Sequence, residues 1–278
     1  MQAPKARVSR ISVLSGAMNS EKPVLWHLGV SHYSEKVRWA LDWKGVEHER
    51  REPPPPVHMG LALWWSRGET KTFPVLELDG ERILDSTAII GALEARYPEP
   101  PLYPEDPADR RRALDLEDFF DEGLGPAVRL FGWHHLRRDS ELLGKVTEQN
   151  LPRPVRNFGP ARAGVSGFAS TFANLRFRVS DPAAEEEARR VIGECLDRLE
   201  RELGGGEHLA GDSFSVADLT AAALLYPLVL PPQGPQAIAG VPASAQGYAD
   251  ELRERPSYGW VERTYAAYRK PVREPVAA

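Results

Sequence analysis

The sequence predicts two domains, an α/β domain over residues 23–98 and an all-helical domain over residues 108–270. Three observations support this division. The first part of the chain alternates short apolar runs with an amphipathic helical pattern. The connector over residues 99–107 is rich in proline, as linkers often are. Beyond the connector, the chain carries helical patterns and no persuasive strand pattern.

A β-α-β unit opens the first domain. Val24–Leu28 is predicted to be a strand, and the helix after it runs from about Ser34 to Trp43, with Gly45 at its end. A second strand is predicted over Val46–Arg51, where a run of prolines stops it. Val57–Trp65 is apolar and ambiguous, and it is compatible with a short helix.

A β-β-α unit completes the first domain. Phe73–Leu78 and Glu81–Leu84 predict a hairpin around the turn Asp79–Gly80. Ser86 is predicted to cap a helix that reaches Tyr97. The order β-α-β followed by β-β-α is that of the thioredoxin fold.

The second domain is predicted to be helical, apart from one irregular insertion near residues 151–182. Its helical patterns cover Ala108–Gly123, Pro126–Arg137, Ser140–Glu148, Ala183–Leu203, Leu219–Leu230 and about Ser257–Tyr268. Ser215 and Asp218 form a variant of the capping box directly before one apolar run. Outside both domains, residues 1–22 are expected to be a disordered extension and residues 271–278 a tail.

Composition and charge argue against several classes of function. The net charge of −5 provides no basic field for nucleic acid or for an anionic membrane surface. The longest apolar run is too short to span a bilayer, and residues 1–22 lack the apolar core of a signal peptide. We therefore expect the protein in the cytoplasm.

The cysteine and histidine pattern argues against disulfides and against a metal centre. Cys195 is the only cysteine, so no intramolecular disulfide can form. His134 and His135 are adjacent, and neighbouring side chains on a helix point apart. We expect no metal, and any thiol chemistry must use a thiol from a cofactor or a substrate.

Ser31 occupies the most informative position of the first domain. It lies between the end of the predicted strand Val24–Leu28 and the N-terminus of the next helix. Unpaired backbone N–H groups and the positive end of the helix dipole converge at such a position. An anion, or a thiol that becomes one, would be stabilised there.

Three segments in their order along the chain resemble the thiol-binding domain of the cytosolic glutathione S-transferase superfamily. They are residues 31–39, 71–78 and 85–90, and the resemblance is sharpest over residues 24–104. It returns in the second domain, where Ser215–Leu219 resembles the buried N-capping box of this family. The resemblance implies a thioredoxin-like domain followed by an all-α domain. The serine of the first segment and the arginine-, alanine- and glycine-rich composition suggest a serine-type, bacterial-like member.

The resemblance implies that Ser31 activates a thiol, with Ser34 as the alternative. An unperturbed cysteine thiol has a pKa near ~8.5, so little thiolate exists at neutral pH. A hydroxyl donor at a helix N-terminus can lower this pKa by roughly one to two units, each worth about 1.36 kcal/mol. The thiolate would then attack an electrophilic carbon. Capping of the helix is the competing role for either serine.

The resemblance also implies a binding site for the rest of the thiol compound. Phe73 and Pro74 are both candidate binding residues, and Pro74 matches the cis-proline of the family. The N–H and C=O of Val75 would then pair with a cysteinyl unit, as an added strand does. Asp85 and Ser86 match the acidic–serine pair that holds a γ-glutamyl carboxylate at a helix N-terminus.

The remaining contacts are expected from a loop and from the helical domain. Lys71 matches a cation for the glycyl carboxylate, and Arg67 is the alternative. The electrophile pocket is expected to use aromatic residues of the helical domain. The candidates are Phe119, Trp133, His134, Tyr258 and Trp260.

These assignments leave two functions open. The first is a glutathione S-transferase-type enzyme for detoxification, which activates the thiol of glutathione, or of a related small thiol, for attack on a small electrophile. The family also implies a homodimer. The second is a non-catalytic ligand-binding or interaction protein of the same fold. It is favoured by His32, where the family often has proline, by the proline run at residues 53–56 and by the unmatched insertion at residues 151–182.

Overall fold

The computed structural model describes residues 22–54, 57–68, 73–148, 178–238 and 240–270. It also describes isolated positions in the predicted insertion, namely residues 151, 159–160, 164, 167–168, 170–171 and 174. The predicted extension, apart from its last residue, and the predicted tail lie outside the described residues, as does much of the predicted insertion.

The first domain is built on a four-stranded mixed sheet with the strand order β2-β1-β3-β4. β1 (Val24–Trp26) runs parallel to β2 (Glu49–Arg51) and antiparallel to β3 (Val75–Leu78), which pairs with β4 (Glu81–Leu84). The predicted hairpin is confirmed, and both residues of its Asp79–Gly80 turn have positive φ angles, 50° and 84°. The predicted thioredoxin order of the elements is confirmed with it.

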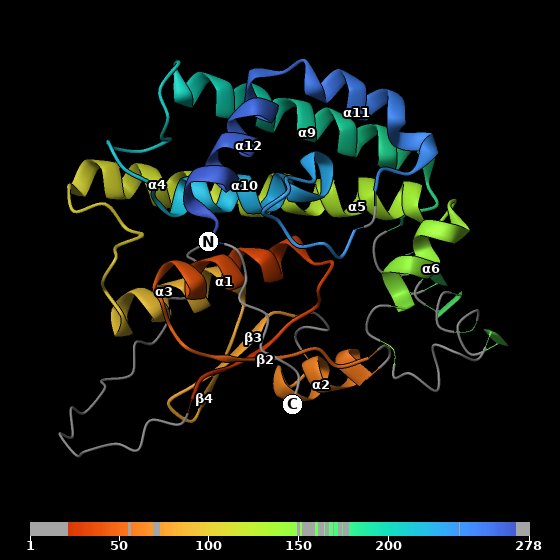
Figure 1. Cartoon of the computed structure of the whole chain (residues 1–278), viewed down its shortest axis with the longest axis horizontal. Helices are drawn as coiled ribbons and strands as arrows, with labels where there is room; N and C mark the ends of the chain where they lie inside the picture. Colours follow the sequence, from red (N-terminus) through yellow and green to blue (C-terminus); the bar gives the residue numbers. More distant parts are fainter. Residues whose placement is uncertain are drawn as a thin grey trace, which may run out of the picture.

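Three helices pack on the sheet, and α1 (His32–Trp43) and α3 (Ser86–Arg96) lie on the side of the helical domain (Figure 1). α2 (Val57–Trp65) confirms the short helix that the sequence allows, and it lies on the opposite face. The side chains alternate accordingly, because successive strand residues point to opposite faces. Leu25 belongs to the main core around α1, whereas its neighbour Trp26 packs with α2.

All regular secondary structure in the described part of the second domain is helical, as predicted. Its elements are α4 (Pro107–Phe119), the π-helical turn η1 (Phe120–Leu124), α5 (Gly125–Leu136), α6 (Ser140–Glu148), α9 (Pro182–Leu203), α10 (Val216–Val229), the 3₁₀ turn η2 (Ala243–Ala245), α11 (Gln246–Arg253) and α12 (Pro256–Tyr268). The predicted break after residue 123 is wrong, since α4, η1 and α5 follow one another without a loop. The sequence patterns also do not predict α11.

α10 is the central helix of the second domain, and it packs against α1, α4, α5 and α12. Its predicted capping box is confirmed. The buried Asp218 carboxylate accepts the Ser215 N–H at 2.9 Å and the Ser215 hydroxyl at 2.8 Å. It also accepts the Leu209 N–H at 2.8 Å, so the start of α10 is tied to the preceding loop.

α1 joins the two domains. Its Lys36 is fully buried, yet the Lys36 ammonium group has polar partners in both domains. It donates to Asp121 at 2.7 Å and to Thr87 at 3.0 Å, and Glu117 lies 2.9 Å away. These partners compensate for the loss of solvation that a buried charge would otherwise suffer. No helix in the described ranges has the length and the apolar character that crossing a bilayer requires.

Candidate active site

A cavity of about 650 Å³ lies between the two domains. From the first domain, its wall includes the loop after β1, the chain before β3 and the start of α3, together with residues after β2 and around α2. From the second domain, it includes η1, α5, the end of α6 and the segment from the end of α10 to α11. Ser31 lines this cavity together with Phe73, Pro74, Asp85 and Ser86, so one wall contains most of the predicted site.

The Ser31 hydroxyl is oriented by the helix that it caps. Its oxygen accepts the Ser34 N–H at 3.2 Å, and its backbone is extended, with φ −80° and ψ 121°. A hydroxyl has one proton to donate and two lone pairs that accept. Among the residues that the structure describes, the Ser31 hydroxyl only accepts, so its proton can be donated to a ligand atom. Capping and thiol activation are therefore compatible at this residue.

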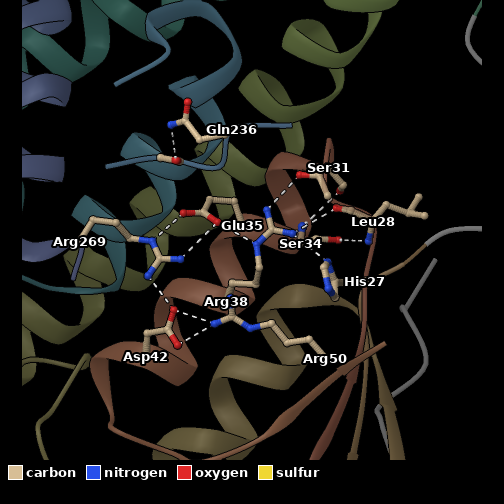
Figure 2. A network of polar contacts seen from close by, with 12 residues as sticks. His27, Leu28, Ser31, Ser34, Glu35, Arg38, Asp42, Arg50, Gln236 and Arg269 are labelled. Carbon is tan, nitrogen blue, oxygen red and sulfur yellow. Dashed lines mark hydrogen bonds and ion pairs between the residues drawn. The ribbon is translucent and has the colours of Figure 1, made fainter. Parts of the chain in front are cut away.

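Ser34 is placed differently. It is fully buried and does not line the cavity. Its hydroxyl oxygen accepts the Leu28 N–H at 3.2 Å and so ties the start of α1 back to the end of β1 (Figure 2). The structure therefore does not support Ser34 as the alternative to Ser31, and the helix cap that the sequence assigned to Ser34 is provided by Ser31.

The two residues after Ser31 dock the loop onto the helical domain. His32 Nε2 lies 3.0 Å from the Gly125 carbonyl oxygen, and the Tyr33 hydroxyl donates to the Asp121 carbonyl at 2.8 Å. Both acceptors are backbone groups at the π-helical turn, a feature that is frequent at functional sites. The histidine that departs from the family pattern therefore has a role, because it fixes the loop across the domain boundary.

His32 stays neutral in the folded protein. Burial lowers its pKa to about 3, and the nearby Arg129 charge adds to the shift. A neutral ring with a proton on Nε2 is the form that donates to the Gly125 carbonyl. The unfolded chain, in contrast, protonates this histidine near pH 6.5.

We predict that His32→Gln makes folding less sensitive to acid. Because the folded pKa is depressed, the wild-type protein has its full stability above about pH 6.5 and loses it as the pH falls towards 3. At pH 5 this one group should cost about 2 kcal/mol, whereas a glutamine amide does not titrate and can still donate to the carbonyl. Urea unfolding at pH 7 and pH 5 measures the difference. Equal acid sensitivity of both proteins would contradict the prediction.

The chain before β3 carries the predicted proline. The Phe73–Pro74 peptide bond is cis, as the resemblance implied, and both residues line the cavity. Val75 is fully buried, pairs with β1 and β4, and does not line the cavity. The ladder positions on both sides of Val75 are thus occupied. The backbone of Phe73, which precedes the strand, is the better position for pairing with an extended ligand, and the assignment to Val75 is corrected accordingly.

Asp85, rather than Ser86, caps α3. Its carboxylate accepts the N–H groups of Thr87 at 2.9 Å and Ala88 at 3.1 Å, and Ser86 is the first residue of the helix. To cap the helix in this way, Asp85 adopts a positive φ angle of 81°, a conformation that is strained for a residue with a side chain. This conformation leaves Ser86 at the cavity wall on the first turn of α3. An anionic group would be stabilised there by the helix N-terminus.

Neither of the two candidate cations is found among the described residues of the wall. Lys71 lies outside the described residues. Arg67 is exposed just after α2 and does not line the cavity. The guanidinium in the described part of the wall belongs to Arg129 of α5, which lies over the Tyr33 ring at 5.7 Å.

The predicted electrophile pocket is largely wrong. Trp133 lines the cavity, but His134 is buried beside it and does not. Phe119 is 40% exposed on another surface, where Arg198 lies 5.7 Å over its ring. Trp260 is buried and donates to the Glu207 carbonyl, and the Tyr258 hydroxyl donates to the Val229 carbonyl. Helical spacing does not reveal which of two neighbours an aromatic side chain faces.

The second wall instead uses residues that sequence reasoning missed. Val128, Phe131 and His135 follow one another at helical spacing along α5, and Tyr248 of α11 packs against Phe131 with the ring centroids 5.0 Å apart. The two nitrogens of His135 lie 2.8 Å from the Ser244 hydroxyl and 3.2 Å from Glu185. The i, i+3 and i+7 spacing along α5 is the one signal that could have identified this wall.

Comparison with known proteins identifies the family. Residues 25–101 match a family model described as the glutathione S-transferase N-terminal domain, and residues 182–255 match the corresponding C-terminal domain. Together these matches cover more than half of the chain. The chain belongs to the glutathione S-transferase superfamily. The predictions of the family, of its architecture and of an enzyme of the transferase type are confirmed at this level.

Several similar relatives carry the name of one enzyme. A "Probable maleylacetoacetate isomerase" of Caenorhabditis elegans is 26% identical over 211 residues, which are 75% of this chain and 80% of the relative. The maleylacetoacetate isomerase of Mus musculus is 32% identical over 117 residues, or 41% and 54% of the two chains. A "Probable glutathione S-transferase" of Nicotiana tabacum is 25% identical over 191 residues, or 69% and 64%.

Solved structures share the fold of this glutathione S-transferase superfamily member. One is a glutathione S-transferase of Methylobacillus flagellatus with glutathione bound, at 19% identity and a TM-score of 0.57, covering 90% of this chain and 100% of that one. Another is a maleylacetoacetate isomerase of Anaeromyxobacter dehalogenans with bound dicarboxyethyl glutathione and citrate, at 23% identity and a TM-score of 0.53, covering 92% and 98%. At these identities the likeness establishes the fold.

The described residues contain no group of three or more His, Cys, Asp or Glu side chains that could hold a metal ion. Cys195 is buried, and burial raises the pKa of its thiol to about 11. A reactive thiolate from this protein side chain is therefore disfavoured at neutral pH.

Proposed function

We propose that this protein binds glutathione in the cavity between its domains and that Ser31 holds the glutathione sulfur as a thiolate. The observation that carries the proposal is the state of the Ser31 hydroxyl. It caps α1 with a lone pair, and its proton is available at the cavity wall. The N-terminus of α1 adds a favourable electrostatic contribution for an anion at the same place.

The rest of the wall suits the two ends of a γ-glutamyl peptide. Ser86 and the start of α3 offer donors to the γ-glutamyl carboxylate. The extended chain at Phe73 offers a backbone edge to the cysteinyl unit. Binding of the glycyl carboxylate by Lys71 stays a proposal.

The second wall supports a small electrophile as co-substrate. Val128, Phe131, Trp133 and Leu136 give it a mainly apolar surface, with Tyr248 facing them from α11. Addition of the thiolate to an electrophilic carbon gives conjugation, and addition followed by loss of glutathione gives isomerisation. The names of the relatives favour isomerisation as a second outcome of the same thiolate chemistry.

Calorimetry with glutathione and with other small thiols tests the binding step. We expect saturable binding of glutathione that is roughly tenfold to hundredfold weaker in Ser86→Ala, since a hydrogen bond to a charged group is worth about 1.5–3 kcal/mol. The control variant is Ser213→Ala, an exposed serine outside the cavity wall. Preference for a different thiol would change the proposed cofactor. Binding without any turnover of electrophiles would favour the non-catalytic alternative.

A homodimer also stays a proposal, which rests on the family resemblance, and a cytoplasmic location stays one that rests on the composition of the sequence. Light scattering on the full chain tests the first of these, with a dimer mass as the expected result.

A further inference from the structure

A chain of alternating charges, buried at Glu35, Arg38 and Arg269 and partly buried at Asp42 and Arg50, lies behind the loop that carries Ser31. Its members, in order of contact, are Arg50, Asp42, Arg269, Glu35 and Arg38 (Figure 2). Arg50 belongs to β2, three of the others to α1, and Arg269 follows α12 at the far end of the second domain. This chain of contacts therefore joins residues that are more than two hundred positions apart in the sequence.

Arg38, at one end of this chain of contacts, binds the loop that carries Ser31 directly. Its guanidinium donates to the carbonyl oxygens of Leu28 and Gly29, both at 3.2 Å, and lies 2.9 Å from His27 Nδ1. These three residues belong to the four-residue segment 27–30 between β1 and Ser31. Burial and the Arg38 charge hold the pKa of His27 far below its ordinary value, so its ring is neutral and can accept from Arg38.

Glu35 links Arg38 to Arg269 of the second domain. It is fully buried, and two guanidinium groups hold its carboxylate. Oε1 accepts Arg269 Nε at 2.7 Å, and Oε2 accepts Arg38 Nε at 2.9 Å and Arg269 Nη2 at 3.5 Å. A carboxylate held from both sides has little freedom to turn. If Arg269 is removed, Glu35 keeps Arg38 alone and can rotate with it.

Arg269 is itself fixed in place. It also donates to Asp42 at 2.7 Å, and its guanidinium lies 5.9 Å over the Trp39 ring. Its side chain is 1% exposed. Buried ion pairs of this kind do not by themselves explain stability, because a protein with apolar residues of similar volume in their place is often equally stable or more stable. A role in placing the loop explains why charges are used here.

We propose that Arg269 is a positioning residue for thiol activation, acting through Glu35 and Arg38 on the loop that carries Ser31. The end of the helical domain thereby sets the geometry of the catalytic serine in the other domain. The catalytic part of this inference rests on the proposed function, whereas the ordering of the loop does not.

The test compares Arg269→Met with Arg50→Met in the full chain. Both variants replace a guanidinium that contacts Asp42 with an unbranched apolar side chain, but Arg269 also contacts Glu35 and Arg50 does not. Hydrogen–deuterium exchange of residues 27–34 reports the order of the loop without any ligand. Glutathione turnover and the pKa of the bound thiol, measured by ultraviolet absorbance, report activation.

We expect Arg269→Met to exchange about tenfold faster over residues 27–34 and to lose about tenfold in kcat, with a raised thiol pKa. The expected loss in kcat is below the ~100-fold loss in rate that a misplacement of 1 Å can cause. Arg50→Met should leave both readouts near those of the wild type. Arg269→Lys, which can reach one carboxylate but not both, should lie between them and decides the matter if the methionine variant does not fold.

Equal loop exchange in the Arg269 and Arg50 variants would overturn the inference, even if Arg269→Met is less stable. If the wild-type protein shows no glutathione turnover, the proposed function fails. Faster loop exchange in the Arg269 variants alone would then still support the positioning role.

Discussion

Ser31→Ala should reduce kcat/KM for glutathione-dependent turnover by about 100-fold, the usual cost of removing one donor to a developing or held anion. The variant removes a hydroxyl group that lines the cavity and has a proton to donate. The pKa of bound glutathione should rise by roughly one to two units towards its free value. Steady-state kinetics and ultraviolet titration of the thiolate measure these two effects.

Capping must be separated from catalysis, because Ser31 also accepts the Ser34 N–H. Ser31→Ala should lose about 1 kcal/mol of stability for the missing cap. Ser31→Asp keeps an acceptor at the cap but has no proton to donate and repels a thiolate, so it should be stable and inactive. Ser31→Thr keeps both functions and should retain most activity. Near wild-type kcat/KM in the alanine and aspartate variants would remove Ser31 from the mechanism.

Gly125→Ala should destabilise the protein by about 2 kcal/mol, within the range for overpacking of a well-packed core. A Cβ at this position would overlap the Tyr33 ring, lying 2.5 Å from its Cζ atom and closer still to its hydroxyl oxygen. Tyr33 cannot move freely, because its hydroxyl is bound to the Asp121 carbonyl. The substitution should therefore push the Ser31 loop away from the π-helical turn and lower activity as well.

Gly193→Ala is the matched control for this effect. Gly193 lies within α9, and nothing stands within 4 Å of a Cβ added there. This variant should gain up to about 1 kcal/mol from the helix propensity of alanine. Chemical denaturation of both variants measures the contrast. A Gly125→Ala protein as stable as Gly193→Ala would contradict the docking geometry described here.

The first domain was predictable because its signals are local. Alternating apolar residues, an Asp79–Gly80 turn and a proline at the start of β3 each act within a few positions of the chain. The caps were harder to assign. Ser86 is a common capping residue, yet Asp85 takes that role through a positive φ angle that no local pattern announces.

The two walls of the cavity also differ in how far local sequence patterns predict them. Ser31, Phe73, Pro74 and Ser86 were predictable because short motifs carry them. The second wall is assembled from α5, the end of α10 and α11, which only the packing of the helices brings together. Glu35 and Arg269 are more than two hundred positions apart in the sequence, and nothing in the chain announces their contact.

A crystal structure of the protein with glutathione tests the central claim most directly. We predict the sulfur atom within hydrogen-bond distance of Ser31 Oγ, with the γ-glutamyl carboxylate at Ser86. A sulfur atom held by another group, away from the start of α1, would contradict the account.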